Sequence, residues 1–343
     1  MVGQEVHIRS VGTALPGSPV DNAALTKAFR LTPVFEQWID AFVGTRTRYL
    51  ALDLVTGEQR YSLADLGETA ARRALETAGV AAGQVDLVVM GTSMPDALLP
   101  TTVNVIAERA GITGVPGYQL QSGCSGAMQA LDLAHQFLLA GRHRTALVLG
   151  GDVCAKHIDL SLDYSGLPPE EMVNMVLFGD GAGAAVLTRE PGPGSVLLHR
   201  AFVELSGLGQ PPGQRLEWYG LGDRDSGTPA VREDFKAIAD LVPELSVDIL
   251  ARLLKEQDWQ PADLDFLLPP QLSVRMTEKI MARLDVPGVR EVSCVAETGN
   301  TGNALPFFQL ERALPEMAPG DRAVAVAVES SRWIKAGLVL EKA

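Results

Sequence analysis

The sequence predicts an α/β fold made of two similar halves, and two observations lead to this prediction. Stretches typical of strands and of helices alternate along the N-terminal part of the chain. Such alternation indicates β-α-β units, a mostly parallel sheet and helices on both of its faces. The pattern of the first half then recurs in the second half, as an internal duplication would produce.

The elements of the first half follow from local pattern. Residues 6–15 alternate between apolar and polar side chains, as a strand does. Residues 62–79 carry apolar side chains near helical spacing, open with Ser62 and close at Gly79, which suits a capped helix. Short apolar runs further along indicate buried parallel strands. The remaining expected elements are strands at 85–93, 118–123 and 145–152 and helices at 101–111 and 124–141.

The duplication is visible as two matched pairs of segments. Residues 245–273 read helix, turn, strand and turn, as residues 67–95 do. Within this pair Asp86 matches Asp265, which lies 179 residues further along. Chance similarity between two β-α-β units is the alternative, but a second pair has nearly the same offset.

The second pair matches residues 123–150 with residues 299–328, at an offset of 176. It makes Cys124 and Asn300 equivalent positions, each at a turn from a strand into a helix. If a pseudo-twofold axis relates the halves, these turns meet near the axis. We therefore expect the two side chains to face each other in one pocket.

Pro and Gly mark the expected boundaries. A linker is expected at 188–195, and it divides the chain into an N-terminal half at 1–190 and a C-terminal half at 191–343. Residues 206–229 form a second Gly/Pro-rich stretch and predict a long loop. Long loops in compact domains are usually functional covers.

Composition and charge exclude several classes of protein. The 343 residues are 46% hydrophobic and 21% charged, which is ordinary for a globular protein. The formal net charge is −13, which argues against nucleic-acid binding because such a chain repels phosphate backbones. No apolar run approaches the length of a membrane span, and the first residues do not resemble a secretory signal. Three cysteines are an odd and small number, so we expect a reducing, cytoplasmic setting.

Cys124 is the candidate nucleophile. It stands in the sequence QSGCSG, where small residues permit a sharp turn from a strand into a helix. A helix N-terminus stabilises thiolate through its dipole and its free N–H groups. The alternative is a small buried apolar side chain, the usual role of a free cysteine. That alternative is favoured for Cys154 and Cys294.

The other motifs do not indicate a catalytic or ligand-binding site. The Gly-rich segment 178–187 lacks the spacing of a nucleotide site, which favours a hairpin or turn packed on the core. The five histidines fall in no motif, and the cysteine spacing fits no zinc site. We expect neither a metal nor a bound cofactor.

Taken together, the duplicated pattern, the QSGCSG turn, the FGDGAGAAVL segment and the TGNTGNA turn resemble the thiolase superfamily. The resemblance is strongest to β-ketoacyl-acyl carrier protein synthase III and covers nearly the whole chain, including a Trp-containing segment at 38–48. It implies a five-layered α-β-α-β-α subunit that forms homodimers. It also implies a Cys that takes an acyl group from a thioester. In the family, a His and an Asn then assist malonyl-thioester decarboxylation and carbon–carbon bond formation.

Carried over by position, Cys124 matches the nucleophile of the family and Asn300 matches its Asn. Pro270 stands where the family has its His, and Ser273 stands in place of an Asn of the same segment. Proline has no ionisable group and no N–H donor. Ser331 lies in the loop that gives the family a second oxyanion donor and can offer a backbone N–H.

This departure favours acyl transfer over condensation. Acylation of Cys124 needs a thiolate and an oxyanion donor, whereas decarboxylation develops an enolate that two aligned donors stabilise. The leading hypothesis is an acyltransferase that moves an acyl group through acyl-Cys124 to a hydroxyl, amine or thiol acceptor, in specialised-metabolite biosynthesis such as that of polyketides or antibiotics. A decarboxylative condensing enzyme and a non-catalytic partner subunit are the alternatives.

The resemblance also suggests the acyl donor. Arg275, Lys279 and Arg283 recur every four residues and form a basic stripe on an expected helix. In the family this helix borders the tunnel mouth where an acidic acyl carrier protein docks; an ordinary solvated helix face is the alternative. Trp38 is placed to stack on the adenine of coenzyme A, but Phe42 replaces a phosphate-binding Arg of many relatives. Acyl carrier protein is therefore favoured over coenzyme A as the donor.

Overall fold

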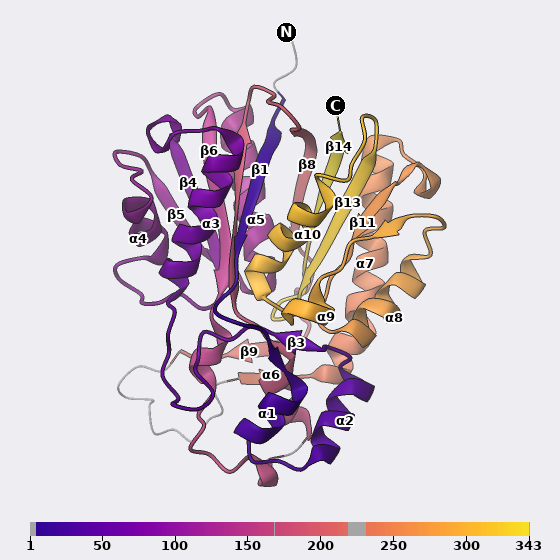
Figure 1. The fold of residues 1–343 in the computed structure, drawn as a ribbon. Helices are drawn as coiled ribbons and strands as arrows, with labels where there is room; N and C mark the ends of the chain where they lie inside the picture. The colour runs from indigo at the N-terminus through magenta and orange to yellow at the C-terminus, as the bar shows by residue number, and fades with distance from the viewer. Residues whose placement is uncertain (1–4, 168, 219–230, 343) are drawn as a thin grey trace.

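The computed structural model describes residues 5–167, 169–218 and 231–342 (Figure 1). The loop expected at 206–229 lies partly outside these residues. Its described part contains the short strand β9 (Gln214–Leu216), which pairs with β10 (Val231–Glu233) in a small antiparallel sheet.

The first half contributes five strands to the main sheet, in the order β5-β4-β6-β7-β1. Strand β4 pairs in parallel with β5 and β6, whereas β6 with β7 and β7 with β1 are antiparallel pairs. The bounds are β1 (His7–Ala14), β4 (Leu87–Thr92), β5 (Gly117–Gln121), β6 (Thr145–Asp152) and β7 (Gly181–Thr188).

The second half repeats this arrangement with the order β12-β11-β13-β14-β8. Strand β11 pairs in parallel with β12 and β13, and β13 with β14 and β14 with β8 are antiparallel. The two halves therefore share one topology, as an internal duplication requires. The bounds are β8 (Val196–Leu205), β11 (Phe266–Leu268), β12 (Arg290–Glu291), β13 (Arg322–Glu329) and β14 (Ile334–Lys342).

The helices complete five layers, as expected (Figure 1). Helices α3 (Leu63–Ala78) and α4 (Thr102–Arg109) cover the outer face of the first set of strands. Helices α5 (Gly126–Leu139) and α10 (Leu305–Ala313) lie between the two sets, and α7 (Phe235–Gln257) and α8 (Val274–Leu284) cover the outer face of the second. The first and second sets meet where His7 and Ile8 of β1 pair with β8.

Local signals in the sequence fix the ends of α3. The Ser62 side chain accepts from the backbone N–H of Asp65, whose carboxylate accepts in return from the N–H of Ser62. This capping box satisfies two N–H groups that the helix itself leaves free. Gly79 ends the helix at a φ of 63°, a left-handed conformation that glycine adopts without strain.

Two strand glycines let the central turns approach the first set of strands. A Cβ at Gly91 of β4 would lie 2.1 Å from the carbonyl carbon of Gly126, at the start of α5. A Cβ at Gly150 of β6 would lie 2.3 Å from the carbonyl oxygen of Asn303, which belongs to the second half. Neither contact tolerates a side chain, so glycine at both positions allows the turns of the two halves to meet.

Short elements gather at one end of the strands, below the sheets in Figure 1. They include a cluster of buried apolar side chains from α1, α2 and α6. Their bounds are α1 (Asn22–Ala28), α2 (Pro33–Phe42), α6 (Pro169–Leu177), β2 (Val20–Asp21) and β3 (Thr47–Arg48).

Two local expectations are corrected. The segment 178–187 forms no hairpin, because Gly181–Thr188 is the fully buried strand β7, which pairs antiparallel with β1 and with β6. The helix expected from residue 124 begins at Gly126, after the 3-10 turn η2 (Gly123–Ser125).

No helix among the described residues is both long and apolar enough to cross a membrane.

Candidate active site

Cys124 lies where two cavities meet. The larger cavity has a volume of about 410 Å³ and the smaller about 200 Å³, and Cys124 lines both. Asn300 lines the smaller cavity, so the structure brings the two equivalent turns of the duplication together at one site. The turn η2 packs against η6 (Gly302–Ala304), which follows Asn300 in the second half.

Asn303 fixes the turn that carries the nucleophile. Its Nδ2 donates to the carbonyl oxygen of Gly123 at 3.0 Å, and its Oδ1 accepts from the N–H of Ala127 at 2.8 Å. The same Nδ2 and the Asn303 backbone N–H both donate to Oδ2 of Asp152 at 2.8 Å. Two buried side chains therefore hold the Cys124 turn in one orientation, and sequence reasoning missed both.

The electrostatic surroundings of Cys124 differ from the expectation for a helix N-terminus. Burial raises the pKa of the Cys124 thiol well above its ordinary value, and the negative charges of Glu329, Asp152 and Glu233 raise it further. Burial and carboxylates both disfavour the thiolate. The expected stabilisation of the thiolate is therefore corrected, because pattern alone does not show which charges the fold places around a turn.

Glu329 lies directly against the Cys124 turn, although its side chain is only 1% exposed. Gly123 has a φ of +53°, and a Cβ there would lie 2.5 Å from Oε1 of Glu329. The carboxylate accepts from the backbone N–H of Ser331 at 2.8 Å, from its hydroxyl at 2.9 Å and from the N–H of Arg332 at 3.3 Å. The Ser331 N–H, expected to serve an oxyanion, is thus donated to Glu329, although Ser331 itself lines the larger cavity.

Asn300 is oriented to present a donor. Its Oδ1 accepts from the N–H of Gly302 at 3.0 Å, and its backbone pairs with Leu177 and Gly179. Within the described parts of the chain, its Nδ2 has no acceptor. Because the oxygen is occupied and the residue lines the smaller cavity, the amide N–H₂ is free for a substrate oxygen.

Pro270 is buried outside the two cavities that the described residues line, so its position supplies no group to the site. Ser273 caps α8, since its hydroxyl accepts from the N–H of Met276 at 3.1 Å, and it also lines the smaller cavity. The segment that replaces the family's His therefore still borders the site, but through a capping hydroxyl.

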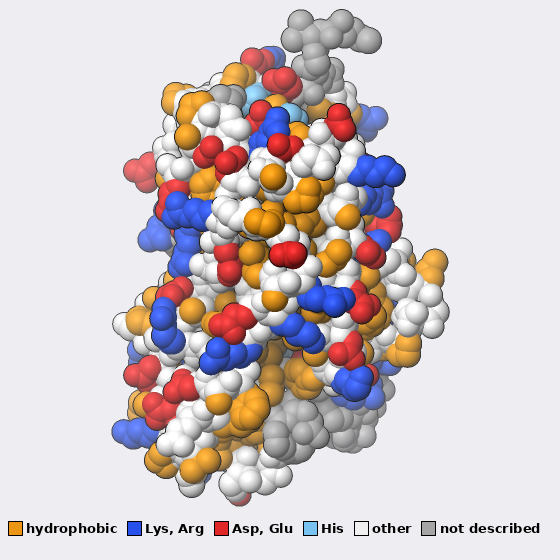
Figure 2. Space-filling view, turned by 90° about the vertical axis from the view of Figure 1, so that its right-hand side faces the viewer, with side chains coloured by type: hydrophobic (Ala, Val, Ile, Leu, Met, Phe, Trp, Pro, Cys, Tyr) orange, Lys and Arg blue, Asp and Glu red, His pale blue; other side chains and the backbone are white. Residues whose placement is uncertain are grey.

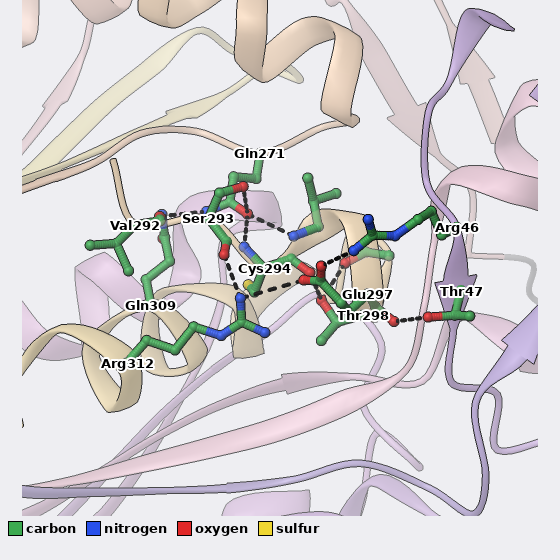
Figure 3. Close-up of polar contacts among 12 residues, drawn as sticks. Arg46, Thr47, Gln271, Val292, Ser293, Cys294, Glu297, Thr298, Gln309 and Arg312 are labelled. Atoms are coloured by element: carbon green, nitrogen blue, oxygen red, sulfur yellow. Dashed lines mark hydrogen bonds and ion pairs between the residues drawn. The ribbon is translucent and has the colours of Figure 1, made fainter. Parts of the chain in front are cut away.

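Gln271 of the same segment supports the Asn300 turn (Figure 3). Its Oε1 accepts from the backbone N–H groups of Cys294 and Val295, at 2.7 and 2.9 Å. These groups begin α9 (Val295–Thr298), which ends two residues before Asn300. Figure 3 also shows Glu297 of α9 between Arg46 and Arg312, with which it forms ion pairs. Sequence reasoning missed Gln271, whose role depends on distant backbone groups.

The smaller cavity opens between the ends of α2, α7 and α8. Phe42, at the end of α2, lines it and is 68% exposed. Trp38 stacks on Phe35, with ring centroids 5.5 Å apart, and contacts the Phe42 ring at 6.0 Å. Trp38 thus lies one helical turn from the cavity and borders it through Phe42.

The basic stripe lies on α8, at the rim of this opening. Arg275 pairs with Glu278 at 3.2 Å, and Arg283 lies 4.0 Å from Glu244 of α7. The Lys279 ammonium donates to a backbone carbonyl of α7. On the face shown in Figure 2, basic and acidic side chains are interspersed. The stripe is therefore exposed but partly paired with acidic neighbours.

The remaining cysteines and histidines are placed as follows. Cys154 lines the larger cavity, and burial raises the pKa of its thiol, whereas Cys294 is fully buried. His157 also lines the larger cavity, and burial lowers its pKa. The described residues include no cluster of His, Cys, Asp and Glu side chains suited to a metal ion.

Comparisons with known proteins identify the family to which the chain is similar. Family models for 3-oxoacyl-[acyl-carrier-protein] synthase III match residues 118–203 and, for its C-terminal part, 254–336, and the thiolase N-terminal model matches 44–159. The chain is 33% identical to β-ketoacyl-[acyl-carrier-protein] synthase III of Alkalilimnicola ehrlichii over 314 residues, which is 90% of each chain.

Two solved structures are similar to this chain over nearly its whole length. The tetronic acid condensing enzyme AbyA1 is 55% identical with a TM-score of 0.95, over 98% of this chain and 99% of that one. The priming β-ketosynthase of the R1128 polyketide pathway is 27% identical with a TM-score of 0.79, over 100% and 98% of the two chains.

Proposed function

Because the chain belongs to the 3-oxoacyl-[acyl-carrier-protein] synthase III family, we propose that it moves an acyl group from a thioester through acyl-Cys124 to an acceptor without decarboxylation. The observation that carries the proposal is a nucleophile and an amide donor in one cavity, with Pro270 buried outside it. The donor is a carrier-protein or coenzyme A thioester, and the acceptor is a hydroxyl, amine or thiol. We propose a homodimer as the active form, because the resemblance to the family implies one.

The first half-reaction uses residues that this chain retains. The Cys124 sulfur attacks the thioester carbonyl, and the carbonyl oxygen gains negative charge as the tetrahedral intermediate forms. The free Nδ2 of Asn300 supports this charge, because its own oxygen is already held by Gly302. The intermediate then collapses and the carbon–sulfur bond of the donor thioester breaks. The donor sulfur takes up the proton that the Cys124 thiol gives up and leaves as a thiol, so the acyl group remains on Cys124.

The decarboxylative second half-reaction lacks its usual groups. Pro270 has no donor for an enolate oxygen, and the Ser331 N–H is donated to Glu329. Loss of one aligned donor at such a site typically costs about 10²–10³ in rate. Acyl transfer forms no enolate from malonate, so the missing donor does not slow it.

The 55% identity to a tetronic acid condensing enzyme favours a hydroxyl acceptor within this scheme. A tetronic acid is a five-membered lactone, so its ring oxygen is an esterified hydroxyl. Building that ring requires one carbon–oxygen and one carbon–carbon bond between two acyl groups, and neither requires loss of carbon dioxide. We propose a hydroxyacyl thioester as the acceptor class and specialised-metabolite biosynthesis as the setting.

Two other functions remain as alternatives. Decarboxylative condensation is favoured by the likeness to a priming β-ketosynthase. A non-catalytic partner subunit would have no need of Cys124 or of the buried network that orients it.

The test is intact-mass analysis after incubation with a panel of acyl-CoA and acyl carrier protein thioesters, together with labelled malonyl thioester. We expect an acyl mass shift at Cys124 and no labelled carbon dioxide. No mass gain with any thioester would favour the non-catalytic subunit, and rapid carbon dioxide release with a β-ketoacyl product would favour condensation.

A further inference from the structure

A buried carboxylate without a cationic partner stands beside the nucleophile. Glu329 ends β13, is 1% exposed and lines the larger cavity together with Cys124. In the described parts of the chain, no Lys, Arg or His forms an ion pair with it, and its partners are the N–H and O–H groups of the next loop. Burying a carboxylate without a cationic partner is costly to folding.

The hydrogen bonds of Glu329 leave one position open on the side of the nucleophile. Oε2 accepts two bonds, from the Ser331 hydroxyl and the Arg332 N–H. From the described residues Oε1 accepts one bond, donated by the Ser331 N–H, and it is the oxygen that faces the Gly123 backbone. Each carboxylate oxygen has two lone-pair sites, so Oε1 retains one acceptor position next to the Cys124 turn.

The other carboxylates near Cys124 fit this role less well. Asp152 is saturated: Oδ1 accepts from Thr92, Ser93 and Met94, and Oδ2 accepts two bonds from Asn303. Its role is to position the turn. Glu233 lies on β10 in the smaller cavity, where the Gln214 amide binds it, and burial raises its pKa to about 7. Glu233 is therefore the competing candidate.

We propose that Glu329 is the proton acceptor of the acyl-transfer step, and that the acceptor it serves bears a hydroxyl. This inference rests on the proposed function. A thiol can ionise in water near neutral pH, whereas a hydroxyl must lose its proton to a base as it attacks. The Ser331 N–H donates to Glu329 and so is not available to an oxyanion, but the same contact holds a carboxylate beside the nucleophile. A carboxylate at this place suits an acceptor that must be deprotonated.

The step balances as follows. The acceptor oxygen forms a bond to the acyl carbon while its proton passes to Oε1 of Glu329. The tetrahedral intermediate collapses, the carbon–sulfur bond of acyl-Cys124 breaks, and the sulfur takes the proton back from Glu329. Burial and nearby carboxylates raise the pKa of the Cys124 thiol, so the returning proton is bound firmly and the sulfur leaves as a thiol. No oxidant, metal or further reactant is needed.

The experiment separates the two half-reactions in the full-length protein. Wild type, Glu329→Gln and the surface control Glu256→Gln are acylated with the most effective thioester of the donor panel, and acyl-Cys124 is measured by intact mass. The acyl-enzymes are then given lactoyl-N-acetylcysteamine as the hydroxyl acceptor or N-acetylcysteamine as the thiol acceptor. Circular dichroism and thermal unfolding establish that each variant is folded.

We expect Glu329→Gln to acylate at the wild-type rate or faster, because a negative charge beside the thiol is gone. Transfer to the hydroxyl should fall about 100-fold or more, the usual contribution of a general base, while transfer to the thiol stays within about tenfold. Formate should restore hydroxyl transfer to Glu329→Ala, since it fills the space with a carboxylate. If Glu329 only supported the structure, formate would not restore transfer to the hydroxyl alone. Glu256→Gln should behave as wild type.

Four outcomes would overturn the inference, and they differ from failure of the proposed function. Equal hydroxyl transfer by wild type and Glu329→Gln excludes Glu329. Loss of hydroxyl transfer in Glu233→Gln with retention in Glu329→Gln assigns the proton to Glu233. Equal losses to both acceptors, without formate rescue, assign Glu329 to structure. If wild type never acylates, or acylates but transfers to no acceptor, the proposed function fails and this inference falls with it. If wild type transfers to the thiol but not to the hydroxyl, acyl transfer stands and this inference alone is overturned.

Discussion

The Cys124 thiol is protonated in the resting site, and this shapes its chemistry. Burial and three carboxylates raise its pKa, so a helix start alone does not make it a ready thiolate. In the proposed reaction, the Cys124 proton must therefore leave as the sulfur attacks the thioester carbonyl. We therefore expect the thiol to react best with substrates that also reach the Asn300 amide in the same cavity.

We predict that Cys124→Ala abolishes covalent acylation while leaving the fold intact. The reason is that Cys124 lines both cavities, on a turn that Asn303 holds. Alanine keeps this turn but has no sulfur. Intact-mass analysis with acyl thioesters measures the loss. Cys294→Ala is the matched control, because Cys294 is buried outside both cavities that the described residues line. An acyl mass gain in Cys124→Ala would show that the nucleophile is misassigned.

At the scale of elements, the ends of three helices line the smaller cavity, through which a substrate would enter in the proposed reaction. Phe42 at the end of α2, Phe235 at the start of α7 and Met276 in the first turn of α8 line the smaller cavity. An apolar passage of this kind suits the uncharged arm of a thioester. The basic residues of α8 stand at its rim, where the acidic surface of a carrier protein would lie.

We predict that reversing the charge of Arg275, Lys279 and Arg283 to Glu slows transfer from acyl carrier protein but not from small thioesters. Within the part of the chain that the structure describes, each pairs with neighbouring acidic or backbone groups at the surface, so the changes leave the core intact. Carrier-protein use by wild type should also fall with added salt, which screens such contacts. The readout is kcat/KM for both donor types, with Arg142→Glu and Arg144→Glu as a control.

Equal losses with carrier-protein and small donors would show that the stripe is structural. Surface ion pairs are each worth at most about 1 kcal/mol, so the loss of those on α8 does not by itself unfold the helix. The buried face of α8 includes Thr277, Ile280 and Leu284, which the charge reversals do not touch.

Sequence reasoning was most successful for elements that depend on local pattern. The buried strands, the capped helix α3 and the pairing of Cys124 with Asn300 followed from periodicity and repeat spacing. What it missed depends on contacts distant in sequence. Asn303 reaches the Gly123 carbonyl, and Glu329 takes the Ser331 N–H, only because the fold packs the two halves together. Neither contact has a periodic signal in the chain.

For the whole molecule, both halves supply residues to the candidate site. The first half provides Cys124 and its helix, and the second provides Asn300, Asn303 and Glu329. A single substitution at residue 270 is therefore not expected to restore the missing donor. Gln271, next to Pro270, is already committed to the start of α9, and its hydrogen bonds fix the path of that segment.

We accordingly predict that wild type transfers acyl groups without consuming malonyl thioester and that Pro270→His does not restore condensation. The Pro269 carbonyl is bound by Gln309 at 2.9 Å, so the backbone at residue 270 is held where it is buried away from the cavities. A His there would be misplaced, and about 1 Å of misplacement can cost about 10²-fold in rate. Labelled carbon dioxide is the readout. Efficient release by wild type, or its recovery in Pro270→His, would contradict the prediction.

The packing of the two halves on each other also predicts how stability depends on pH. His135 lies on α5, which belongs to the first half, and its Nε2 lies 3.1 Å from the carbonyl oxygen of Leu198 on β8 of the second. Burial lowers the pKa of His135 to about 4, so the folded protein keeps this ring neutral, with Nε2 donating. The unfolded chain binds a proton near the ordinary value of about 6.5.

Between about pH 6.5 and pH 4 the unfolded state therefore holds the extra proton, and stability falls as the pH falls through this window. At pH 5 the loss due to His135 is about 2 kcal/mol, from roughly 1.5 pH units at about 1.4 kcal/mol each. His135→Gln keeps a donor for the Leu198 carbonyl but cannot titrate. Urea unfolding at pH 7 and pH 5 should show a smaller decrease for His135→Gln than for wild type, because other groups titrate alike in both. Equal decreases in the two proteins would mean that the ring takes up its proton in the folded state and that the contact between the halves tolerates the charge.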